Sequence, residues 1–295
     1  MKVLAIGSTG WIGSQCVLLL RAAGHEVVEG TCRIDDYGSI GAELDRVQPT
    51  HVLLTAGKTG RPNIDWCEDH KIETMETNCL GTCVVVSECY RRNILCCYVG
   101  TGCIYEYDAT HQIGGVGFTE QDEPNFTKSW YSYTKVCAEN VLVGYPNVCI
   151  LRLRMPISSD LHPRSFVTKI VSYKKVINIP NSMTILDDLL PLVPDIMQRG
   201  LTGIYNFCNL GVISHNEILD LYTTYVDPSF RYQNFTVEEQ AEVVKAPRSN
   251  NALSVAKLMT VYPDIPHIKD SIVRVFEKIA CAQSKDETEK VFVIE

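Results

Sequence analysis

Tyr131 and Lys135 stand four residues apart, in the order Y-x-x-x-K, at the start of a stretch that the hydrophobic spacing predicts to be helical. Four residues rise about 6 Å along a helix, so both side chains share one face. An ammonium beside a phenol favours tyrosinate, so we expect Lys135 to lower the pKa of Tyr131 from about 10. Such a phenol can give a proton to a carbonyl oxygen while hydride arrives at the carbon. Tyr133 has no lysine four residues later.

A glycine turn near the start of the chain could hold a dinucleotide. The run GSTGWIG follows an apolar stretch and opens a predicted helix. Glycines there permit a tight turn, the approach of a pyrophosphate to the backbone, and close packing of helix on strand. The helix N-terminus offers unpaired N–H groups and partial positive charge to the phosphates. The cofactor contacts expected from this turn are Gly7, Thr9, Gly10, Trp11, Ile12 and Gly13.

The end of the second predicted strand, at residues 26–28, bears on which dinucleotide binds. The acidic residue that usually holds the ribose 2′-hydroxyl of NAD is not clear there, and the chain continues through Glu29 to Arg33. The guanidinium of Arg33 could pair with a 2′-phosphate, which favours NADPH. The alternative is NADH, with Glu29 on the ribose and Arg33 in solvent.

Short apolar runs alternate with amphipathic stretches through the first half of the chain. We expect strands at residues 3–6, 26–28, 51–55, 94–99 and 148–152, and helices at 11–23, 40–47, 64–71, 77–91 and 131–143. This alternation implies parallel strands with right-handed crossovers. Because the first and third strands lack a two-residue period, both their faces should be buried. The predicted fold is α/β, a Rossmann-type doubly wound parallel sheet with a smaller C-terminal substrate lobe.

The pattern loosens after Arg154, where prolines and serines mark a loop. We expect a helix near 166–173, a return to the sheet at 186–199 and 204–207, and short helices in the rest. The predicted NADP-binding Rossmann domain is residues 1–155, with about 175–207 returning to it. The predicted substrate-binding lobe is residues 156–174 and 208–283, and the charged residues 284–295 are expected to form a flexible tail.

Composition excludes several classes of protein. The net charge is −8 over 295 residues, with no basic stripe, so a nucleic-acid partner is not expected. No run approaches the roughly 18 apolar residues of a membrane span, and the N-terminus reads as a strand rather than a signal peptide, so we expect a cytoplasmic protein. The 13 cysteines read mainly as buried thiols. The histidines show no metal-ligand spacing, and we expect no metal.

The glycine turn, Asn78, Thr101, Tyr131 and Lys135 together resemble the extended short-chain dehydrogenase/reductases. In that family a serine or threonine after the fourth strand binds the substrate carbonyl, and Thr101 occupies the matching position. Asn78 matches a helix asparagine near the cofactor. The resemblance implies catalytic roles for Thr101, Tyr131 and Lys135, and cofactor contacts for Asn78, Tyr131 and Lys135.

Longer stretches of the sequence indicate one subfamily, and the resemblance extends from about residue 4 to residue 275. They are GRPNIDWC (60–67), TGCIYEY (101–107), RMPISSDL (154–161), IPNSMTIL (179–186) and APRSNN (246–251). They resemble the nucleotide-rhamnose synthase/epimerase-reductases. The resemblance implies inversion at carbons 3 and 5 of a UDP- or dTDP-linked 4-keto-6-deoxyglucose, then NADPH-dependent reduction at carbon 4. A separate 4,6-dehydratase would supply this substrate, and family members are often homodimers.

The same resemblance assigns the residues of epimerisation and of substrate binding. Cys103 and Lys169 match the family's epimerisation pair. Both epimerised carbons flank the ketone, so proton loss gives an enolate that donors can stabilise. Inversion also needs acid and base groups beyond the tyrosine. Arg248 is expected to bind the diphosphate through its bidentate fork, with Arg61 and Asn63 as further substrate contacts.

Two other functions stay open from the sequence. The first is a 4-reductase alone, similar to bacterial dTDP-4-dehydrorhamnose reductases, which have Asp-Tyr where this chain has Gly102-Cys103. Cys103 and Lys169 argue against it. The second is a non-catalytic NADP-binding regulatory subunit, of the kind found with methionine adenosyltransferase. The set Thr101, Tyr131 and Lys135 argues against that.

Overall fold

Six parallel strands form the central sheet of the protein. The computed structural model describes the backbone of residues 1–292 and the side chains of residues 1–284. Residues 293–295 lie outside the described part. Neighbouring strands follow the order β2-β1-β3-β4-β5-β7. In this register Val3 lies opposite Val27 on one side and opposite His51 on the other. The strands are β1 (Lys2–Ile6), β2 (Glu26–Glu29), β3 (His51–Leu54), β4 (Leu95–Thr101), β5 (Val148–Leu153) and β7 (Gly203–Asn206).

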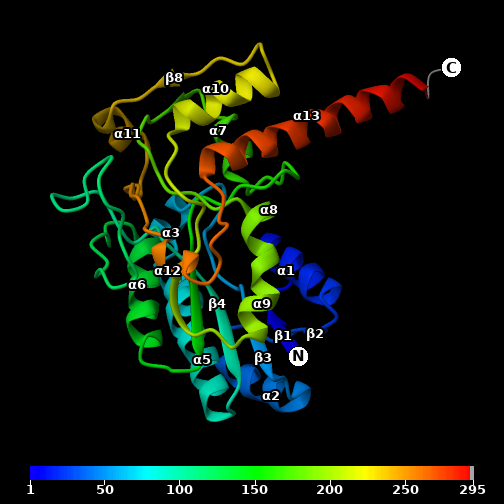
Figure 1. Ribbon diagram of the computed structural model, residues 1–295. Helices are drawn as coiled ribbons and strands as arrows, with labels where there is room; N and C mark the ends of the chain where they lie inside the picture. Colours follow the sequence, from blue (N-terminus) through cyan, green and yellow to red (C-terminus); the bar gives the residue numbers. More distant parts are fainter. Residues whose placement is uncertain (293–295) are drawn as a thin grey trace.

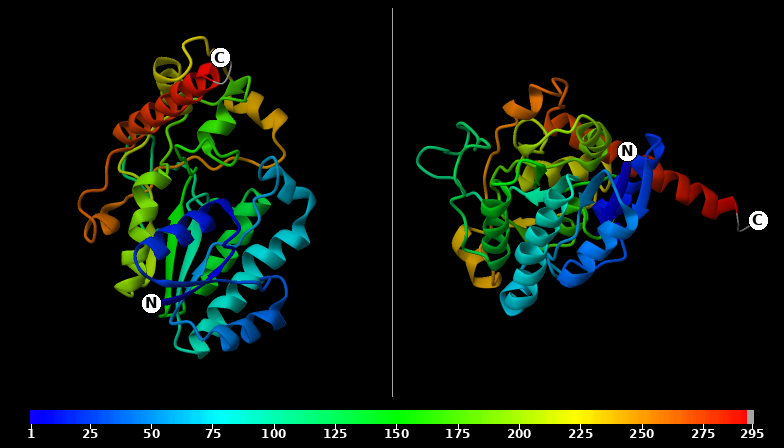
Figure 2. Two further views of the ribbon diagram at one scale, coloured as in Figure 1. Left: turned by 90° about the vertical axis from the view of Figure 1, so that its right-hand side faces the viewer. Right: turned by 90° about the horizontal axis from the view of Figure 1, so that it is seen from below.

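Helices cover both faces of this sheet (Figures 1 and 2). On one face, α1 (Trp11–Ala22) and α9 (Val193–Gln198) pack apolar residues against the strands. On the other face lie α2 (Tyr37–Val47), α5 (Thr82–Arg91) and α6 (Trp130–Leu142). Strands between two helical layers must be apolar on both faces, and every residue of β5 is buried. The predicted α/β doubly wound sheet is therefore confirmed.

The strand order places a crevice at the carboxyl ends of the strands. The chain passes from β1 to β2 on one side and then to β3 on the other, so the connections that follow β1 and β3 diverge. Open α/β sheets bind ligands at such a point. Most of the predicted site residues lie in or next to the connections at this edge, which span residues 7–10, 55–64, 102–129 and 154–165.

A smaller lobe lies above the carboxyl ends of the strands (Figure 1). Apolar residues of α7 (Phe166–Ile170), α10 (His215–Tyr225) and α13 (Ile268–Phe292) form its core. Beside them β6 (Lys175–Val176) pairs in parallel with β8 (Gln233–Asn234). A further helix of the lobe is α11 (Val237–Val243). Helix α12 (Ala256–Met259) packs against β7 instead, with Leu258 in the core on the α1 side of the sheet, so these residues lie outside the lobe to which we assigned them.

The C-terminal helix corrects our expectation of short helices throughout the lobe. Helix α13 is 25 residues long, because Ile268, Ile272, Val275 and Ile279 recur at helical spacing and are buried in the lobe core. Its backbone continues through residues 284–292, where we expected a flexible tail, and the tail's mobility stays a prediction. The return to the central sheet also begins later than residue 175, since β6 pairs within the lobe.

Several predicted helices are divided into shorter pieces. The predicted helix 64–71 is divided between α3 (Asp65–Asp69) and the start of α4 (Lys71–Met75), with a non-helical His70 between them. The predicted helix 77–91 begins in the π-helix η1 (Glu76–Gly81) and continues as α5. Residues 186–199 form α8 (Leu186–Leu189), the 3₁₀ turn η2 (Leu190–Leu192) and α9, because prolines lack the N–H that a continuous helix needs.

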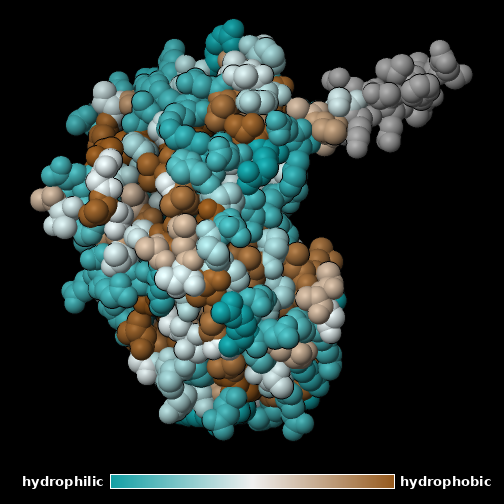
Figure 3. All heavy atoms as spheres, viewed as in Figure 1, coloured by the Kyte–Doolittle hydropathy of each residue, from teal (hydrophilic) through white to brown (hydrophobic). Residues whose placement is uncertain are grey.

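The surface in the orientation of Figure 1 is mostly hydrophilic, with apolar residues in scattered groups (Figure 3). Such scattered groups are normal on a globular protein. Across the described residues, none of the helices is both long and apolar enough to cross a membrane.

Candidate active site

The glycine turn forms a cradle between β1, β3 and α1. Gly7 has a φ of +89°, and a Cβ there would lie 2.5 Å from the amide nitrogen of Ala56. A Cβ on Gly13 would lie 2.2 Å from the carbonyl oxygen of Gly7. Helix α1 begins after Gly10 with no side chain capping its first N–H groups. Uncapped N–H groups behind a glycine cradle fit the pyrophosphate of a dinucleotide.

The other residues of the turn divide between solvent and the protein interior. Thr9 is exposed, and Ile12 packs on the core beneath α1. The Trp11 ring stacks on His162 with centroids 4.9 Å apart and planes at 3°, and its Nε1 donates to Asp160 at 3.4 Å. The loop after β5 therefore closes over the start of α1, a contact that the sequence did not reveal.

Arg33 lies beyond β2 with its guanidinium already paired. It donates from Nε and Nη2 to the carboxylate of Asp35, at 2.9 and 2.6 Å, and its side chain is 71% exposed. This hydrogen-bonded pair holds the pKa of Asp35 below its usual range. Glu29, the acidic alternative, pairs with Arg21 at 3.0 Å. A 2′-phosphate at Arg33 would compete with Asp35, so the choice between NADPH and NADH stays a prediction.

Lys135 and Asn78 converge beside the loop after β3. Lys135 is buried, and its Nζ donates to the phenol oxygen of Tyr98 at 2.8 Å. Asn78, in η1, bonds both the N–H and the C=O of Lys58 at 2.7 and 2.8 Å. A Cβ on Gly57 would lie 3.4 Å from both Asn78 Oδ1 and Lys135 Nζ. The two side chains therefore meet at the bare backbone of Gly57.

Tyr131 lies buried in the first turn of α6, which Ser129 caps through the N–H of Ser132. Burial raises the pKa of Tyr131, the nearby Cys103 adds to this, and a hydrogen bond with Thr101 acts in the opposite direction. Our expectation that Lys135 lowers this pKa is therefore wrong. The phenol is desolvated, and the Lys135 ammonium is hydrogen-bonded to Tyr98 instead.

Cys103 lies next to Thr101, just past the end of β4. Its N–H donates to Thr101 Oγ1 at 3.1 Å, and its C=O accepts from the Ser132 hydroxyl of α6. Its sulfur accepts from Nη1 of Arg154 at 3.1 Å. The structure thus brings Thr101, Cys103 and Tyr131 together. Arg154 begins the run RMPISSDL, but the residue pattern alone assigns it no role.

Lys169 lies on α7 in the lobe, half-buried. Burial lowers its pKa, and the charge of Arg164 adds to this. Among the described residues, no hydrogen bond joins its amine to Cys103 or Tyr131. Its role in epimerisation stays a prediction.

Asn63 and Arg248 come together although 185 residues separate them. Arg248 Nη2 donates to Asn63 Oδ1 at 3.5 Å, and Nη1 pairs with the carboxylate of Asp65 at 2.8 Å. Arg61, on the same loop as Asn63, is exposed. A diphosphate that binds Arg248 would compete with Asp65, a partner that sequence reasoning missed.

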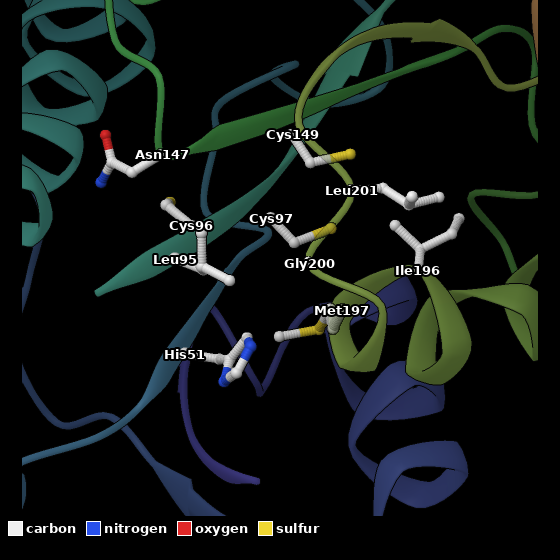
Figure 4. A pocket seen from close by; sticks show the side chains of 10 residues that line it. All are labelled: His51, Leu95, Cys96, Cys97, Asn147, Cys149, Ile196, Met197, Gly200 and Leu201. Atoms are coloured by element: carbon white, nitrogen blue, oxygen red, sulfur yellow. The ribbon is translucent and has the colours of Figure 1, made fainter. Parts of the chain in front are cut away.

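A small cavity at the opposite edge of the sheet is separate from this site. Figure 4 shows its lining, which includes His51, Cys97 and Cys149 from the amino-terminal ends of β3, β4 and β5. It holds about 10 Å³, close to the minimum for one water molecule. Among the side chains of residues 1–284, no group of three or more histidine, cysteine, aspartate or glutamate residues could hold a metal ion.

Comparison with known proteins bears on what this arrangement does. The pattern of the NAD dependent epimerase/dehydratase family matches residues 3–189. A bifunctional dTDP-4-dehydrorhamnose 3,5-epimerase/dTDP-4-dehydrorhamnose reductase of Arabidopsis thaliana is 53% identical over 277 residues, covering 93% of this chain and 92% of the relative. The crystal structure of the L780 UDP-rhamnose synthase of Acanthamoeba polyphaga mimivirus has a TM-score of 0.90 and 39% identity, over 94% of this chain and 99% of that one.

Longer plant relatives contain a similar segment. A trifunctional UDP-glucose 4,6-dehydratase/UDP-4-keto-6-deoxy-D-glucose 3,5-epimerase/UDP-4-keto-L-rhamnose-reductase of Arabidopsis thaliana is 50% identical over 280 residues. The match covers 94% of this chain but 42% of that relative. The chain therefore spans less than half the length of the trifunctional protein.

Proposed function

This chain belongs to the NAD dependent epimerase/dehydratase family and, within it, to the nucleotide-rhamnose epimerase/reductases, and we propose that it converts a UDP- or dTDP-linked 4-keto-6-deoxyglucose to the corresponding nucleotide-L-rhamnose. The observation that carries this proposal is the hydrogen-bonded group of Thr101, Cys103 and Tyr131 at the carboxyl end of β4. A ketone bound there would meet two hydroxyl donors and a thiol.

We further propose NADPH as the cofactor. The uncapped start of α1 and the cradle at Gly7 and Gly13 suit a dinucleotide pyrophosphate. Asn78 and Lys135 border the same crevice, and Arg33 offers a guanidinium for the 2′-phosphate. When bound, NADPH supplies the hydride that reduces carbon 4 of the sugar.

Epimerisation, in this proposal, is proton exchange at the carbons beside the ketone. The Cys103 thiolate removes a proton from the carbon and becomes a thiol, and the C–H electrons move into the enolate. The hydroxyls of Thr101 and Tyr131 donate to the enolate oxygen and stabilise its charge. The Lys169 ammonium returns a proton from the opposite face and becomes an amine. Solvent then restores both groups.

For reduction, Tyr131 is the proton donor to the carbonyl oxygen. Burial raises its pKa, so the phenol keeps its proton at neutral pH until negative charge develops on the substrate. After the transfer, the Thr101 hydroxyl favours the phenolate. Lys135, whose ammonium borders Gly57, is proposed to hold the cofactor beside this phenol.

Substrate binding is proposed at Arg248, Asn63 and Arg61, with Arg248 exchanging Asp65 for the diphosphate. The substrate is the product of a 4,6-dehydration, so we propose that a separate dehydratase supplies it in the cytoplasm. The same proposal includes a homodimer and no nucleic-acid or membrane partner.

The decisive experiment incubates the purified protein with NADPH or NADH and with each 4-keto-6-deoxyglucose nucleotide. Loss of cofactor absorbance follows reduction, and NMR identifies the product sugar. We expect nucleotide-L-rhamnose, with faster turnover for NADPH. A reduced sugar without inversion would favour a 4-reductase alone. Cofactor binding without turnover of either nucleotide would favour the non-catalytic regulatory subunit.

A further inference from the structure

Arg154 is a fully buried cation directly after β5. Its Nη1 donates to Cys103 Sγ at 3.1 Å and to Ser249 Oγ at 3.2 Å. Its Nη2 donates to the side-chain oxygen of Asn181 and to the Ser249 carbonyl oxygen. All the oxygen acceptors are neutral groups, and the remaining acceptor is a sulfur that can become an anion.

No carboxylate balances this charge among the ion pairs of the described residues. Arg152, two residues earlier on β5, shows the usual arrangement, because its guanidinium pairs with the buried carboxylate of Glu139. Arg154 has no such partner, and its Nε is buried without a hydrogen bond. A buried charge without a counter-ion is costly. The free-energy cost of burying the Arg154 charge falls when an anion forms beside the guanidinium.

The titratable groups near this guanidinium are uncharged at neutral pH. Burial, with the charge of Arg154 adding to it, lowers the pKa of His215 to about 4. Burial raises the pKa values of Tyr107 and Cys208, while Arg154 opposes the rise in both. Burial also raises the pKa of Tyr131, and the nearby Cys103 adds to this. Cys103 alone among these groups accepts a hydrogen bond from the guanidinium.

We propose that Arg154 is a positioning residue that stabilises the thiolate of Cys103 and aims its sulfur at the substrate carbon. The thiol releases its proton to solvent, and the thiolate later takes one proton from carbon. Arg154 acts only through the hydrogen bond that its Nη1 donates to the sulfur. The catalytic part of this inference rests on the proposed function, but the thiolate itself can be measured without substrate.

The first test compares alkylation of two thiols in one protein. Iodoacetamide reacts with thiolates, and peptide mass spectrometry reports Cys103 separately from Cys281, an exposed thiol on α13. In Arg154→Gln we expect the Cys103/Cys281 rate ratio at neutral pH to fall about tenfold or more, since a hydrogen bond from a charged group is lost. Arg154→Lys should restore most of the ratio. An unchanged ratio in Arg154→Gln, or equal losses in both variants, would overturn the proposal.

A second measurement needs no substitution at Arg154 and covers the case in which Arg154→Gln does not fold. The ultraviolet absorbance of thiolates is measured against pH for the wild type and for Cys103→Ala, and the difference between the two gives the signal of Cys103. The difference between the wild type and Cys281→Ala gives the signal of Cys281. We expect the Cys103 signal to appear at lower pH than the Cys281 signal. Appearance at the same pH, or higher, contradicts the inference.

Measurements of epimerisation distinguish the role of Arg154 from the proposed function on which it rests. With 4-keto-6-deoxyglucose nucleotide in D₂O, Arg154→Gln should slow deuterium entry at carbons 3 and 5 about tenfold or more, with NADPH affinity retained. If the thiolate depends on Arg154 but the wild-type protein forms no inverted, reduced sugar, the proposed function fails and the thiolate assignment stands. If turnover requires Cys103 but formation of its thiolate does not depend on Arg154, the role assigned to Arg154 is wrong and the proposed function stands.

Discussion

Lys135 donates a hydrogen bond from its buried Nζ to the phenol oxygen of Tyr98, at 2.8 Å, across the space between α6 and β4. The hydrogen-bond partner of the lysine in the Y-x-x-x-K pattern is therefore Tyr98 and not Tyr131. Tyr98 holds the ammonium near Asn78 and Gly57, where the cofactor is proposed to bind. This arrangement leads to a pH prediction.

Reduction should weaken as the pH rises through about 8. Burial lowers the pKa of Lys135 to about 8, so its charge is present below that pH and lost above it. We expect kcat/KM for reduction to fall above pH 8, because the ammonium that borders the proposed cofactor site at Gly57 loses its charge. In Lys135→Arg the charge persists, so this alkaline fall should disappear even if the maximal rate is lower. Its survival in Lys135→Arg would assign the fall to another group.

Tyr131→Phe should lose reduction while keeping the cofactor. The change removes one hydroxyl from a buried ring, and a general acid contributes on the order of 10²–10⁴ in rate. Stopped-flow reduction and NADPH titration measure the two effects. Tyr133→Phe, two residues away and exposed, is the matched control and should behave as wild type. Equal loss of binding and rate in Tyr131→Phe would discredit the proton-donor role.

Cys103→Ala should separate epimerisation from reduction. Deuterium entry at carbons 3 and 5 should fall by on the order of 10²–10⁴, because the proton-transfer group is gone. A 4-keto-rhamnose nucleotide, already inverted, should still be reduced. Cys281→Ala is the control, since that thiol is exposed on α13. Undiminished rhamnose formation by Cys103→Ala would show that another group carries out the proton exchange at these carbons.

Gly13→Ala should damage both folding and cofactor binding. The added Cβ would lie 2.2 Å from the Gly7 carbonyl oxygen and 2.6 Å from Thr55 Oγ1, so the turn must shift. We expect a loss of about 1–3 kcal/mol in unfolding free energy, with weaker NADPH binding. Gly144→Ala is the control, since its Cβ would have its nearest neighbour at 3.5 Å. If Gly13→Ala had the wild-type free energy of unfolding and the wild-type affinity for NADPH, the close packing at this glycine would be contradicted.

His215 should make the protein less stable in mild acid. Its pKa is lowered from 6.5 to about 4 in the folded protein, so the unfolded chain binds the proton more tightly. The stabilisation is complete above pH 6.5 and is lost as the pH falls towards 4; by pH 5 the loss is about 2 kcal/mol. His215→Gln, which cannot titrate, should lack this loss in urea unfolding at pH 7 and pH 5. Equal losses in both proteins would show that His215 is not responsible.

The sequence by itself determined the fold class and the local parts of the site. Continuous apolar runs such as 3–6 fix strands buried on both faces, and the glycine turn fixes the first crossover. Four-residue spacing places Tyr131 and Lys135 on one helix, and adjacency keeps Cys103 beside Thr101. These features depend on neighbours within one turn or one strand, so the residue pattern is sufficient to predict them.

Only the tertiary structure decided the partners and the charge states. Tyr98 meets Lys135 across 37 positions, Arg154 meets Cys103 across 51, and Arg248 reaches Asn63 across 185. No periodicity encodes such pairs, because the stacking of strands and the docking of the lobe create them. Burial depends on the same packing, and desolvation of the phenol raises the pKa of Tyr131. For this reason the expected direction of the pKa shift of Tyr131 was wrong, although the place of Tyr131 in the site could be predicted.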